Sequence, residues 1–297
     1  MTAAALLAGY GADLAFGDPR RGHPVAAFGR VAGALERILW RPSRRAGAAY
    51  ALLLVGGAAA LGRAARGPAL GAALVWVALG GRSLVFEARR VGALVDAGDL
   101  PAARSAVTAL VGRDPSRLDG EELCRAVVES LAENTVDAVV APLMWAAAAG
   151  PGGVLAHRAA NTLDAMVGHR TERHERFGWA SARLDDALNW PAARMTAGLT
   201  AAFAPLVGGS PAVTLRTVRR DGAAHPSPNG GRAEAAFAGA LGLSLGGRNV
   251  YAGRVEDRPR LGGGPVPTPA DVERAARLSL AVGGAAAVGA ALTGGWR

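Results

Sequence analysis

Two apolar stretches decide the fold: residues 46–62 read AGAAYALLLVGGAAALG, and residues 67–85 read GPALGAALVWVALGGRSLV. Each is close to the roughly 20 residues that a transmembrane helix needs. Arg63 and Arg66 mark a short turn between the two stretches. The sequence therefore predicts a helical hairpin that crosses a membrane and returns.

Two further apolar segments lie outside this hairpin. Residues 1–16 contain Asp13 and lack the basic n-region of a secretory signal, which predicts an uncleaved membrane helix or an interfacial segment. Residues 278–295 predict a last span, with Trp296 and Arg297 beyond it. The composition, 51% hydrophobic with a mean hydropathy of +0.20, favours a membrane protein, although a high-GC genome gives a similar bias.

All 33 basic residues are arginines, and the net charge is +9. They are spread along the chain without a basic run that carries interleaved aromatic residues, which argues against a nucleic-acid-binding protein. The predicted spans leave Arg63, Arg66 and Arg297 on one side of the membrane and the other 30 arginines on the side of the polar motifs. By the positive-inside rule, we expect a multi-pass protein of the cell membrane whose motif side faces the cytoplasm.

Two more apolar stretches contain a break. Residues 138–156 include Pro151-Gly152-Gly153, where a turn would leave two short arms typical of re-entrant or buried helices. Residues 192–215 have a similar break at Gly208-Gly209-Ser210-Pro211. The predicted fold class is therefore an all-α, polytopic membrane protein with re-entrant or buried helical hairpins and cytoplasmic polar loops.

Polar residues set into apolar helix mark the predicted site. Glu129, Glu133 and Asp137 recur at four-residue steps, and such acids are costly in apolar surroundings unless they bind something. Asn134-Thr135-Val136-Asp137 and Asn161-Thr162-Leu163-Asp164 are near copies, so we expect them to face one cavity. Arg125 and Glu129 are instead interpreted as an ion pair on a solvated face.

Four other stretches are rich in functional side chains. They are Gly17-Asp18-Pro19 with His23-Pro24, Val111 to Asp114, Phe177-Gly178-Trp179 leading into Arg183, Asp185, Asp186, Asn189 and Arg194, and His225 to Gly231. The first either holds a metal or moves a proton, or is simply a capped turn. Arg113 and Asp114 either clamp a phosphate or pair with each other. Adjacent Asp185 and Asp186 suit Mg²⁺, and the amides of the last stretch can cradle an anion.

Known nucleotide and zinc signatures do not explain these residues. A chain without lysine cannot have a Gly-x-x-x-x-Gly-Lys phosphate loop, and it has no His-Glu-x-x-His motif. The residues alone predict a Mg²⁺-dependent site for a phosphorylated or anionic substrate, and they do not name the reaction.

In order along the chain, the motifs resemble those of the CobD/CbiB family. The resemblance runs from about Gly11 to Gly262 and is weakest in the apolar hairpin and the C-terminal span. Its motifs are GDP (17–19) with HP (23–24), VGRD (111–114), AENTVD (132–137), APL (141–143), NTLD (161–164), FGW (177–179), ARLDD (182–186), SPN (227–229) and LGG (245–247) with Tyr251. We expect a single domain over residues 1–297, with the hairpin at about 46–85, a motif-rich catalytic region at about 111–262 and a span at about 278–295.

The resemblance implies an adenosylcobinamide-phosphate synthase, a membrane ligase of cobalamin (vitamin B12) biosynthesis. ATP, as co-substrate with Mg²⁺, would activate a propionate of adenosylcobyric acid, and an amide would form with aminopropanol, either free or as its O-phosphate. The lipid bilayer is an expected partner, other enzymes of the pathway are candidate partners, and nucleic acid is not expected.

The resemblance also suggests roles for individual residues. Candidates for catalysis, including removal of a proton from the attacking amine, are Glu133, Asp137, His23 and Asp164. Candidates for binding substrate and phosphate are Arg113, Asn134, Asn161, Arg183, Asn189, Ser227 and Asn229. Candidates for metal binding are Asp18, Asp185 and Asp186. His169, Arg170 and His174 are given no role.

Two alternatives of other classes stay open. A Mg²⁺-dependent intramembrane prenyl- or alcohol-transferase would also use paired acids in a helical cavity, and it would turn over a lipid diphosphate without ATP. A non-catalytic membrane scaffold for corrinoid enzymes would tolerate substitution of Glu133, Asp137 and Asp186, but it has no need of buried acids.

Overall fold

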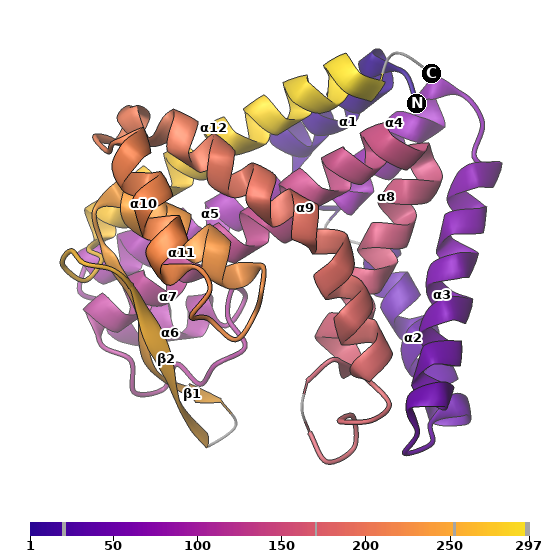
Figure 1. Ribbon diagram of the computed structural model, residues 1–297, viewed down its shortest axis with the longest axis horizontal. Helices are drawn as coiled ribbons and strands as arrows, with labels where there is room; N and C mark the ends of the chain where they lie inside the picture. The colour runs from indigo at the N-terminus through magenta and orange to yellow at the C-terminus, as the bar shows by residue number, and fades with distance from the viewer. Residues whose placement is uncertain (20–21, 170, 252–253, 295–297) are drawn as a thin grey trace. The chain divides into compact units, whose positions relative to one another are not determined.

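The computed structural model describes residues 1–19, 22–169, 171–251 and 254–294, with the backbone alone at 250, 251, 254 and 255. Arg170, Trp296, Arg297 and the side chain of Tyr251 lie outside this description. The elements in chain order (Figure 1) are α1 (Ala3–Phe16), α2 (Pro24–Leu39), α3 (Arg44–Ala64), α4 (Pro68–Ala78), α5 (Gly81–Asp96), α6 (Leu100–Val107), α7 (Gly120–Thr135), η1 (Val136–Val140), α8 (Ala141–Val167), α9 (Trp179–Phe203), η2 (Ala204–Val207), α10 (Pro211–Asp221), α11 (Gly230–Leu241), β1 (Ser244–Tyr251), β2 (Arg254–Gly262) and α12 (Pro269–Gly294).

The predicted all-α, polytopic class is confirmed. Within the described residues, the sheet structure consists of one two-stranded hairpin. In the part of the chain that the structure describes, four helical stretches are long and apolar enough to cross a membrane, namely α3, Pro68–Asp96, Gly120–Val167 and α12. The helix α1, with 14 residues, is apolar but shorter.

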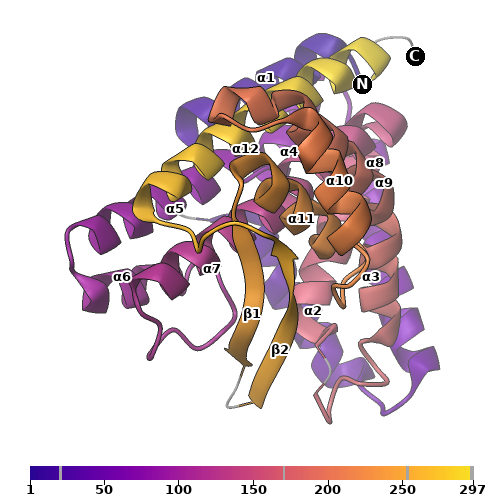
Figure 2. The ribbon, with the colours of Figure 1, turned by 60° about the vertical axis from the view of Figure 1, so that its left-hand side comes forward.

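The chain forms two units that alternate along the sequence. Unit 1 contains Met1–Arg82, Asp137–Pro191 and Ala286–Arg297, and unit 2 contains Ser83–Val136 and Ala192–Ala285. The chain passes between them within α5, at the junction of α7 and η1, within α9 and within α12. Inside unit 1, the C-terminal end of α12 lies beside α1 (Figures 1 and 2), and Gly294 is so close to α1 that an added Cβ would lie 3.3 Å from Leu6 Cδ1.

Glycines allow α3 and α8 of unit 1 to pack closely. A Cβ added at Gly62 would overlap the carbonyl group of Pro151, and one added at Gly152 would lie 2.8 Å from Cγ of Arg63. Small residues at such contacts are typical of helices that associate in membranes. Also on α3, buried Tyr50 packs against Phe177, with their ring centroids 5.0 Å apart.

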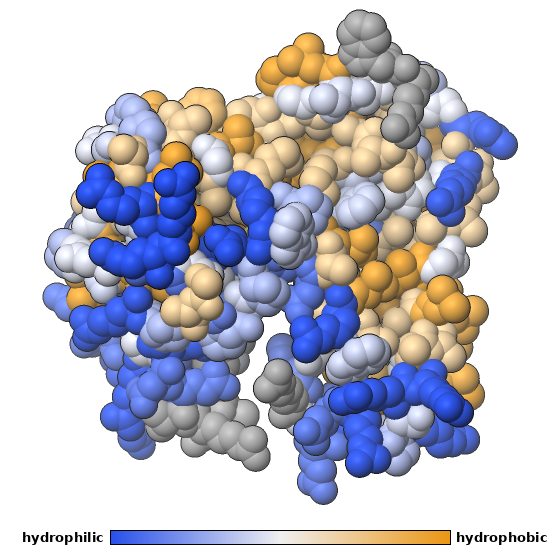
Figure 3. Space-filling model, in the orientation of Figure 1, coloured by the Kyte–Doolittle hydropathy of each residue, from blue (hydrophilic) through white to orange (hydrophobic). Residues whose placement is uncertain are grey.

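The outer face of α3 is apolar. Leu52, Leu53 and Leu61 are 75%, 56% and 69% exposed. In Figure 3, apolar side chains gather over the region where Figure 1 draws α3, and hydrophilic ones lie towards its two ends. An exposed apolar surface of this kind marks a membrane contact, which agrees with the predicted span.

The helices are interrupted near the predicted breaks. Gly150 has φ 65° and ψ −155°, so a kink precedes Pro151 inside α8. Gly208, with φ 77°, ends η2 before α10. The stretch predicted as one span over residues 67–85 is also interrupted, because α4 ends at Ala78 and the amide of Gly80 donates to the carbonyl oxygen of Ala138, at 3.2 Å.

In unit 2, the antiparallel hairpin of β1 and β2 packs against α7, α10 and α11 (Figure 2). A register irregularity between Leu245 and Gly247 coincides with two glycines of positive φ, Gly246 at 80° and Gly247 at 95°. The sequence analysis predicted no strand here, and this is corrected by the structure. The reason is that these strands carry glycines, a proline and few β-branched residues, so tertiary packing rather than local propensity forms them.

Candidate functional site

A cluster of acids and amides lies in unit 1. Asn161 Nδ2 on α8 donates to Asp137 Oδ2 at 3.2 Å and to Asp185 Oδ1 at 3.3 Å. Asn189 Nδ2 lies 3.1 Å from both carboxylate oxygens of Asp185. We call Asp137, Asn161, Asp185 and Asn189 the carboxylate–amide cluster. The structure thus brings together four residues that the sequence analysis had singled out from three separate motifs.

Helix geometry explains why these side chains meet. Asp137 lies in η1, a five-residue π-helical stretch, and such stretches are frequent at functional sites. Asp185 and Asn189 are one turn apart on α9, so they point the same way. His157 Nε2 lies 2.8 Å from Asn189 Oδ1, on the other side of the amide, and this contact orients Asn189 towards Asp185.

The two acids on α9, Asp185 and Asp186, have raised pKa values. Burial raises the pKa of Asp185 to about 7, and the nearby charge of Asp164 contributes to this rise. Burial also raises the pKa of Asp186, against the opposing effect of Arg183, whose Nη1 is 3.8 Å from Asp186 Oδ2. Burial therefore disfavours the charged form of both neighbouring aspartates.

Asp18 is linked to the same cluster through Arg158, which interacts electrostatically with both Asp18 and Asp137. His23 Nε2 lies 3.6 Å from Asp18 Oδ1. His23 also caps α2, because its Nδ1 accepts the amide hydrogen of Val25 at 3.2 Å. The capped turn is thus confirmed, and the imidazole of His23 lies beside the carboxylate of Asp18; binding of a metal or transfer of a proton there stays a prediction.

The donor set of unit 1 fits Mg²⁺. Carboxylate and amide oxygens are the hard ligands that this ion prefers. Five aspartates lie in or beside this cluster, namely Asp18, Asp137, Asp164, Asp185 and Asp186, and their described neighbours include Arg158, Arg183 and His23. A divalent cation would stabilise the charge of Asp185, which burial and, to a smaller extent, the nearby charge of Asp164 disfavour.

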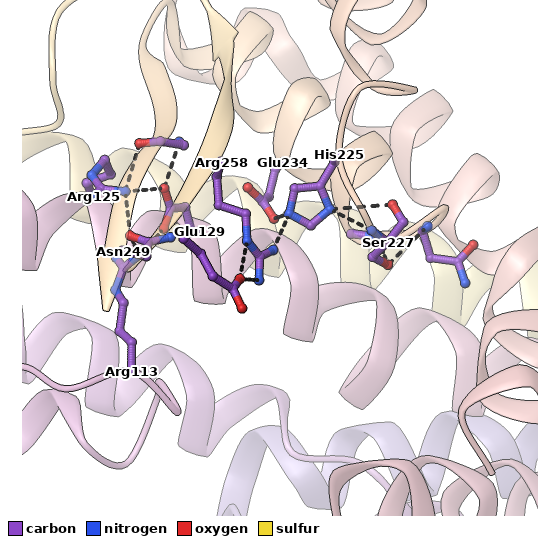
Figure 4. A network of polar contacts seen from close by, with 12 residues as sticks. Arg113, Arg125, Glu129, His225, Ser227, Glu234, Asn249 and Arg258 are labelled. Atoms are coloured by element: carbon purple, nitrogen blue, oxygen red, sulfur yellow. Dashed lines mark hydrogen bonds and ion pairs between the residues drawn. The ribbon is translucent and has the colours of Figure 1, made fainter. Parts of the chain in front are cut away.

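A second polar cluster lies in unit 2 (Figure 4). Glu129 on α7 accepts hydrogen bonds from Arg113 Nη1 at 2.8 Å and from Arg125 Nη1 at 3.0 Å. Both arginines also donate to Oδ1 of Asn249 on β1, and the amide of Gly246 donates to Glu129 Oε1 at 2.8 Å. We call Arg113, Arg125, Glu129 and Asn249 the guanidinium–carboxylate cluster.

This cluster corrects one expectation. The predicted pairing of Arg125 with Glu129 is confirmed, but the predicted solvated face is wrong. Arg125 and Glu129 are only 6% and 8% exposed, because the hairpin covers them. Their buried charges compensate one another and are further satisfied by backbone groups of β1.

One turn after Glu129, the half-buried Glu133 meets His225 and Glu234. Ligand atoms of these three residues lie within 4.8 Å of one another, beside a cavity of about 80 Å³ that Arg258 also lines. Burial raises the pKa of Glu234 well above its usual value, and the charge of Glu133 adds to this rise. Burial, and then the charge of Arg258, lower the pKa of His225, which favours a neutral imidazole.

The loop at His225 to Gly231 is held by its own side chains. Ser227 Oγ accepts the amide hydrogens of Asn229 at 3.3 Å and Gly230 at 3.0 Å, and the amide of Ser227 lies 3.1 Å from His225 Nδ1. These three amides are therefore engaged within the loop, in contrast to the predicted anion cradle. Asn229 Oδ1 accepts a hydrogen bond from Arg194 Nη1 at 3.0 Å.

Asn134 and Asp114 have hydrogen-bond partners nearby in the sequence, unlike Arg113. Asn134 Nδ2 donates to the carbonyl oxygen of Ser130 at 3.0 Å and to its hydroxyl at 3.1 Å. Arg113 belongs to the guanidinium–carboxylate cluster, while the carboxylate of Asp114 accepts the amide hydrogen of Ser116 at 2.9 Å. The interpretation in which Arg113 pairs with Asp114 is therefore not supported.

Sequence reasoning missed several residues of these clusters. Glu234 could have been predicted, because it is a single acid in the alanine-rich stretch of α11 and burying it is as costly as burying Glu133. His157 carried no such signal, since a lone histidine on an apolar helix is usually a core residue. Asn249 and Arg258 could not be found without the hairpin that positions them.

Comparison with known proteins gives the family. The model of the CobD/CbiB protein family matches residues 6–279. The cobalamin biosynthesis protein CobD of Mycobacterium tuberculosis H37Rv is 52% identical over 93% of this chain and 90% of its own length. The proteins of the same name from Rhodobacter capsulatus and Geobacter metallireducens are 43% and 46% identical, over 93% and 84% of this chain and 92% and 83% of their own lengths. No solved structure matches. The chain belongs to the CobD/CbiB family.

Proposed function

We propose that this chain acts in cobalamin biosynthesis as an adenosylcobinamide-phosphate synthase. The relatives that it matches over nearly their whole length are named for that pathway. The observation that carries the proposal is the carboxylate–amide cluster, where carboxylate and amide oxygens from three motifs gather, as suits a Mg²⁺–nucleotide complex. The cluster lies among apolar helices, which agrees with an enzyme of the cell membrane whose polar motifs face the cytoplasm.

The proposed reaction has two steps. A propionate carboxylate of adenosylcobyric acid attacks the γ-phosphorus of ATP, which gives an acyl phosphate and ADP. The amine of aminopropanol, free or O-phosphorylated, then attacks the acyl carbon; the C–N bond forms, inorganic phosphate leaves with the electrons of the C–O bond, and the amine loses a proton. The products are the amide, ADP and phosphate.

The residues of unit 1 supply the proposed roles. Asp185 and Asp186, with Asp18, would hold Mg²⁺, which neutralises phosphate charge when bound. Arg183 would bind a phosphate oxygen, and Asn161 and Asn189 orient the carboxylates that they contact.

A proton acceptor must lie near the attacking amine. Asp137 is our first candidate, because it lies in the π-helical stretch and accepts a hydrogen bond from Asn161 within the carboxylate–amide cluster. Glu133, Asp164 and His23 remain the other candidates. In unit 2, Arg113, Asn134, Ser227 and Asn229 stay candidates for substrate binding, although each already has a partner within the chain.

The test is reconstitution of the reaction. The full chain, purified in detergent, is incubated with Mg²⁺, ATP, adenosylcobyric acid and either aminopropanol or its O-phosphate, and the corrinoid product and ADP are followed by mass spectrometry and a coupled assay. We expect product only when all three substrates are present, and the preferred amine identifies the second substrate. No product, even with the soluble enzymes of the pathway added, would favour a scaffold, whereas turnover of a lipid diphosphate without ATP would favour a transferase.

Site variants complete this test. Asp137→Asn and Asp186→Asn should each lose most of the turnover while keeping wild-type thermal stability. Wild-type turnover in both variants would contradict the assignment of the site.

A further inference from the structure

The cavity of about 80 Å³ in unit 2 brings together three side chains with metal-ligating atoms. Glu133 comes from α7, His225 from the loop after α10, and Glu234 from α11. His225 and Glu234 are 8% and 4% exposed. Glu133 is 92 positions from His225, and His225 is nine positions from Glu234. The fold rather than the local sequence therefore creates the arrangement.

The Nε2 atom of His225 faces this cavity. It lies 2.7 Å from Arg258 Nη1 (Figure 4) and 3.4 Å from Glu234 Oε1. The other ring nitrogen, Nδ1, faces the loop, where the amide nitrogen of Ser227 lies at 3.1 Å and its carbonyl oxygen at 3.4 Å. A contact with the backbone through one ring nitrogen also orients metal-ligating histidines.

The possible ligand atoms of the three residues converge beside the cavity. His225 Nε2 and Glu234 Oε1 are 3.4 Å apart, and Glu133 and Glu234 approach each other closely enough to share a hydrogen bond. Two ligands bound to one ion at about 2.0–2.2 Å lie about 3.0–3.5 Å apart in tetrahedral or octahedral geometry. The separation of His225 Nε2 and Glu234 Oε1 lies within this range, and the ligand atoms of all three residues lie within 4.8 Å of one another.

A cationic group is already present at this place. The guanidinium of Arg258 contacts the same nitrogen that would bind a metal, and it also interacts with Glu133 and Glu234. Its other contacts include the carboxylate of Glu256, at 3.2 Å, on the exposed side of the hairpin. An arginine anchored outside the cavity in this way can withdraw when another cation enters.

We propose that Glu133, His225 and Glu234 bind one divalent transition-metal ion, such as Zn²⁺ or Mn²⁺, and that Arg258 takes its place in the metal-free protein. One imidazole and two carboxylates favour such an ion over Mg²⁺, which prefers oxygen ligands alone. This site is separate from the carboxylate–amide cluster proposed for Mg²⁺, and it does not depend on the proposed reaction.

Metal binding is measured without reference to activity. The full chain in detergent is stripped with EDTA, dialysed against Zn²⁺ or Mn²⁺, and analysed by mass spectrometry of the bound metal and by competition with a chromogenic chelator. With excess Mg²⁺ in the buffer to occupy the separate site proposed at the carboxylate–amide cluster, we expect one equivalent of Zn²⁺ or Mn²⁺. His225→Gln and Glu234→Gln should weaken binding by about 10-fold or more. Binding of less than half an equivalent to the wild type would overturn the proposal.

Three further variants separate ligation from misfolding. Arg258→Gln removes the competing cation, so it should tighten metal binding about 10-fold, a gain that an unfolded protein cannot imitate. Glu121→Gln removes an exposed acid of the same helix as Glu133 and should change nothing. Asp185→Asn, which alters the proposed Mg²⁺ site, should also leave the stoichiometry unchanged. Weaker binding by Arg258→Gln, or equal losses in Glu121→Gln and Glu234→Gln, would overturn the proposal.

Discussion

The two units hold their buried acids in different ways. In unit 1, the carboxylate of Asp185 is surrounded by the amides of Asn161 and Asn189. In unit 2, the carboxylate of Glu129 is bound by the guanidiniums of Arg113 and Arg125. An amide orients a carboxylate but leaves its charge uncompensated, whereas a guanidinium neutralises it.

This difference separates acids that are available for a cation from acids that support the fold. The raised pKa of Asp185, about 7, shows that burial and nearby Asp164 disfavour its charge. Glu129 instead belongs to a network that joins α7 to the hairpin through Asn249 and Gly246. We therefore expect substitutions in the first cluster to impair function and substitutions in the second to impair stability.

The largest effect is expected for Glu129→Gln. This change leaves two buried guanidiniums without their counter-charge, and breaking a buried ion pair costs about 3–5 kcal/mol. Thermal or denaturant unfolding in detergent measures the loss. The control is Glu121→Gln, an exposed acid on the same helix, which should stay within about 0.5 kcal/mol of the wild type. Equal stability of the two variants would remove the distinction between the clusters.

Asp185→Asn should have the opposite signature. Loss of the carboxylate should lower turnover in the three-substrate assay by about 100-fold or more. Its stability should be unchanged or higher, because the neutral amide no longer repels Asp164. Asp96→Asn, at an exposed position of α5, serves as the control for both measurements. Substantial unfolding of Asp185→Asn would mean that this acid, too, supports the fold.

Gly62→Ala tests the frame around the carboxylate–amide cluster. Its methyl group would overlap the carbonyl of Pro151 on α8, the helix that also carries Asn161, and overpacking of this kind costs about 1–3 kcal/mol. Gly57→Ala on the same helix has open space around its Cβ and should be neutral or slightly stabilising. Indistinguishable unfolding temperatures for these two variants would show that the close contact of α3 with α8 is not tight.

The smallest effect is expected where the hairpin of unit 2 is anchored. Asp221 Oδ2 accepts the amide hydrogen of Gly262 at 2.8 Å, so Asp221→Asn should cost about 1 kcal/mol. Hydrogen bonds from Arg220 lower the pKa of Asp221 below the ordinary value of 3.8. Its contribution is therefore complete above pH 3.8 and is lost as the pH falls through the lowered value. An unfolding series from pH 6 to pH 3 should show a steeper decline for the wild type than for Asp221→Asn; parallel curves would contradict this.

The sequence was most informative where one helix settles the geometry. Spans of apolar residues predicted α3 and α12, and Pro151 with its neighbouring glycines predicted the kink that the structure places at Gly150. The positions of Asp185 and Asn189, one turn apart, followed from helical periodicity. The contact of Asn161 with Asp137 shows that the two related motifs lie close together, although Asn134 binds within its own helix.

The sequence was least informative where distant segments meet. The burial of Arg125 and Glu129 depends on the hairpin, whose glycine-rich strands have little intrinsic propensity to form. The same hairpin carries Arg258 to His225, 33 positions away, and no periodicity predicts that contact. Local rules also treated a four-residue spacing of opposite charges as a surface feature, because only the tertiary fold can show that such a pair is covered.

The contact of α1 with the end of α12 has a consequence for biogenesis. At the roughly 5–20 residues per second at which chains are synthesised, tens of seconds separate the emergence of these two helices. During that interval α1 lacks α12, whose Gly294 lies beside Leu6 in the finished unit. Unit 1 is therefore completed only after unit 2 has been translated, and a ribosome that stalls before α12 would leave the membrane with an unfinished first unit exposed to quality-control proteases.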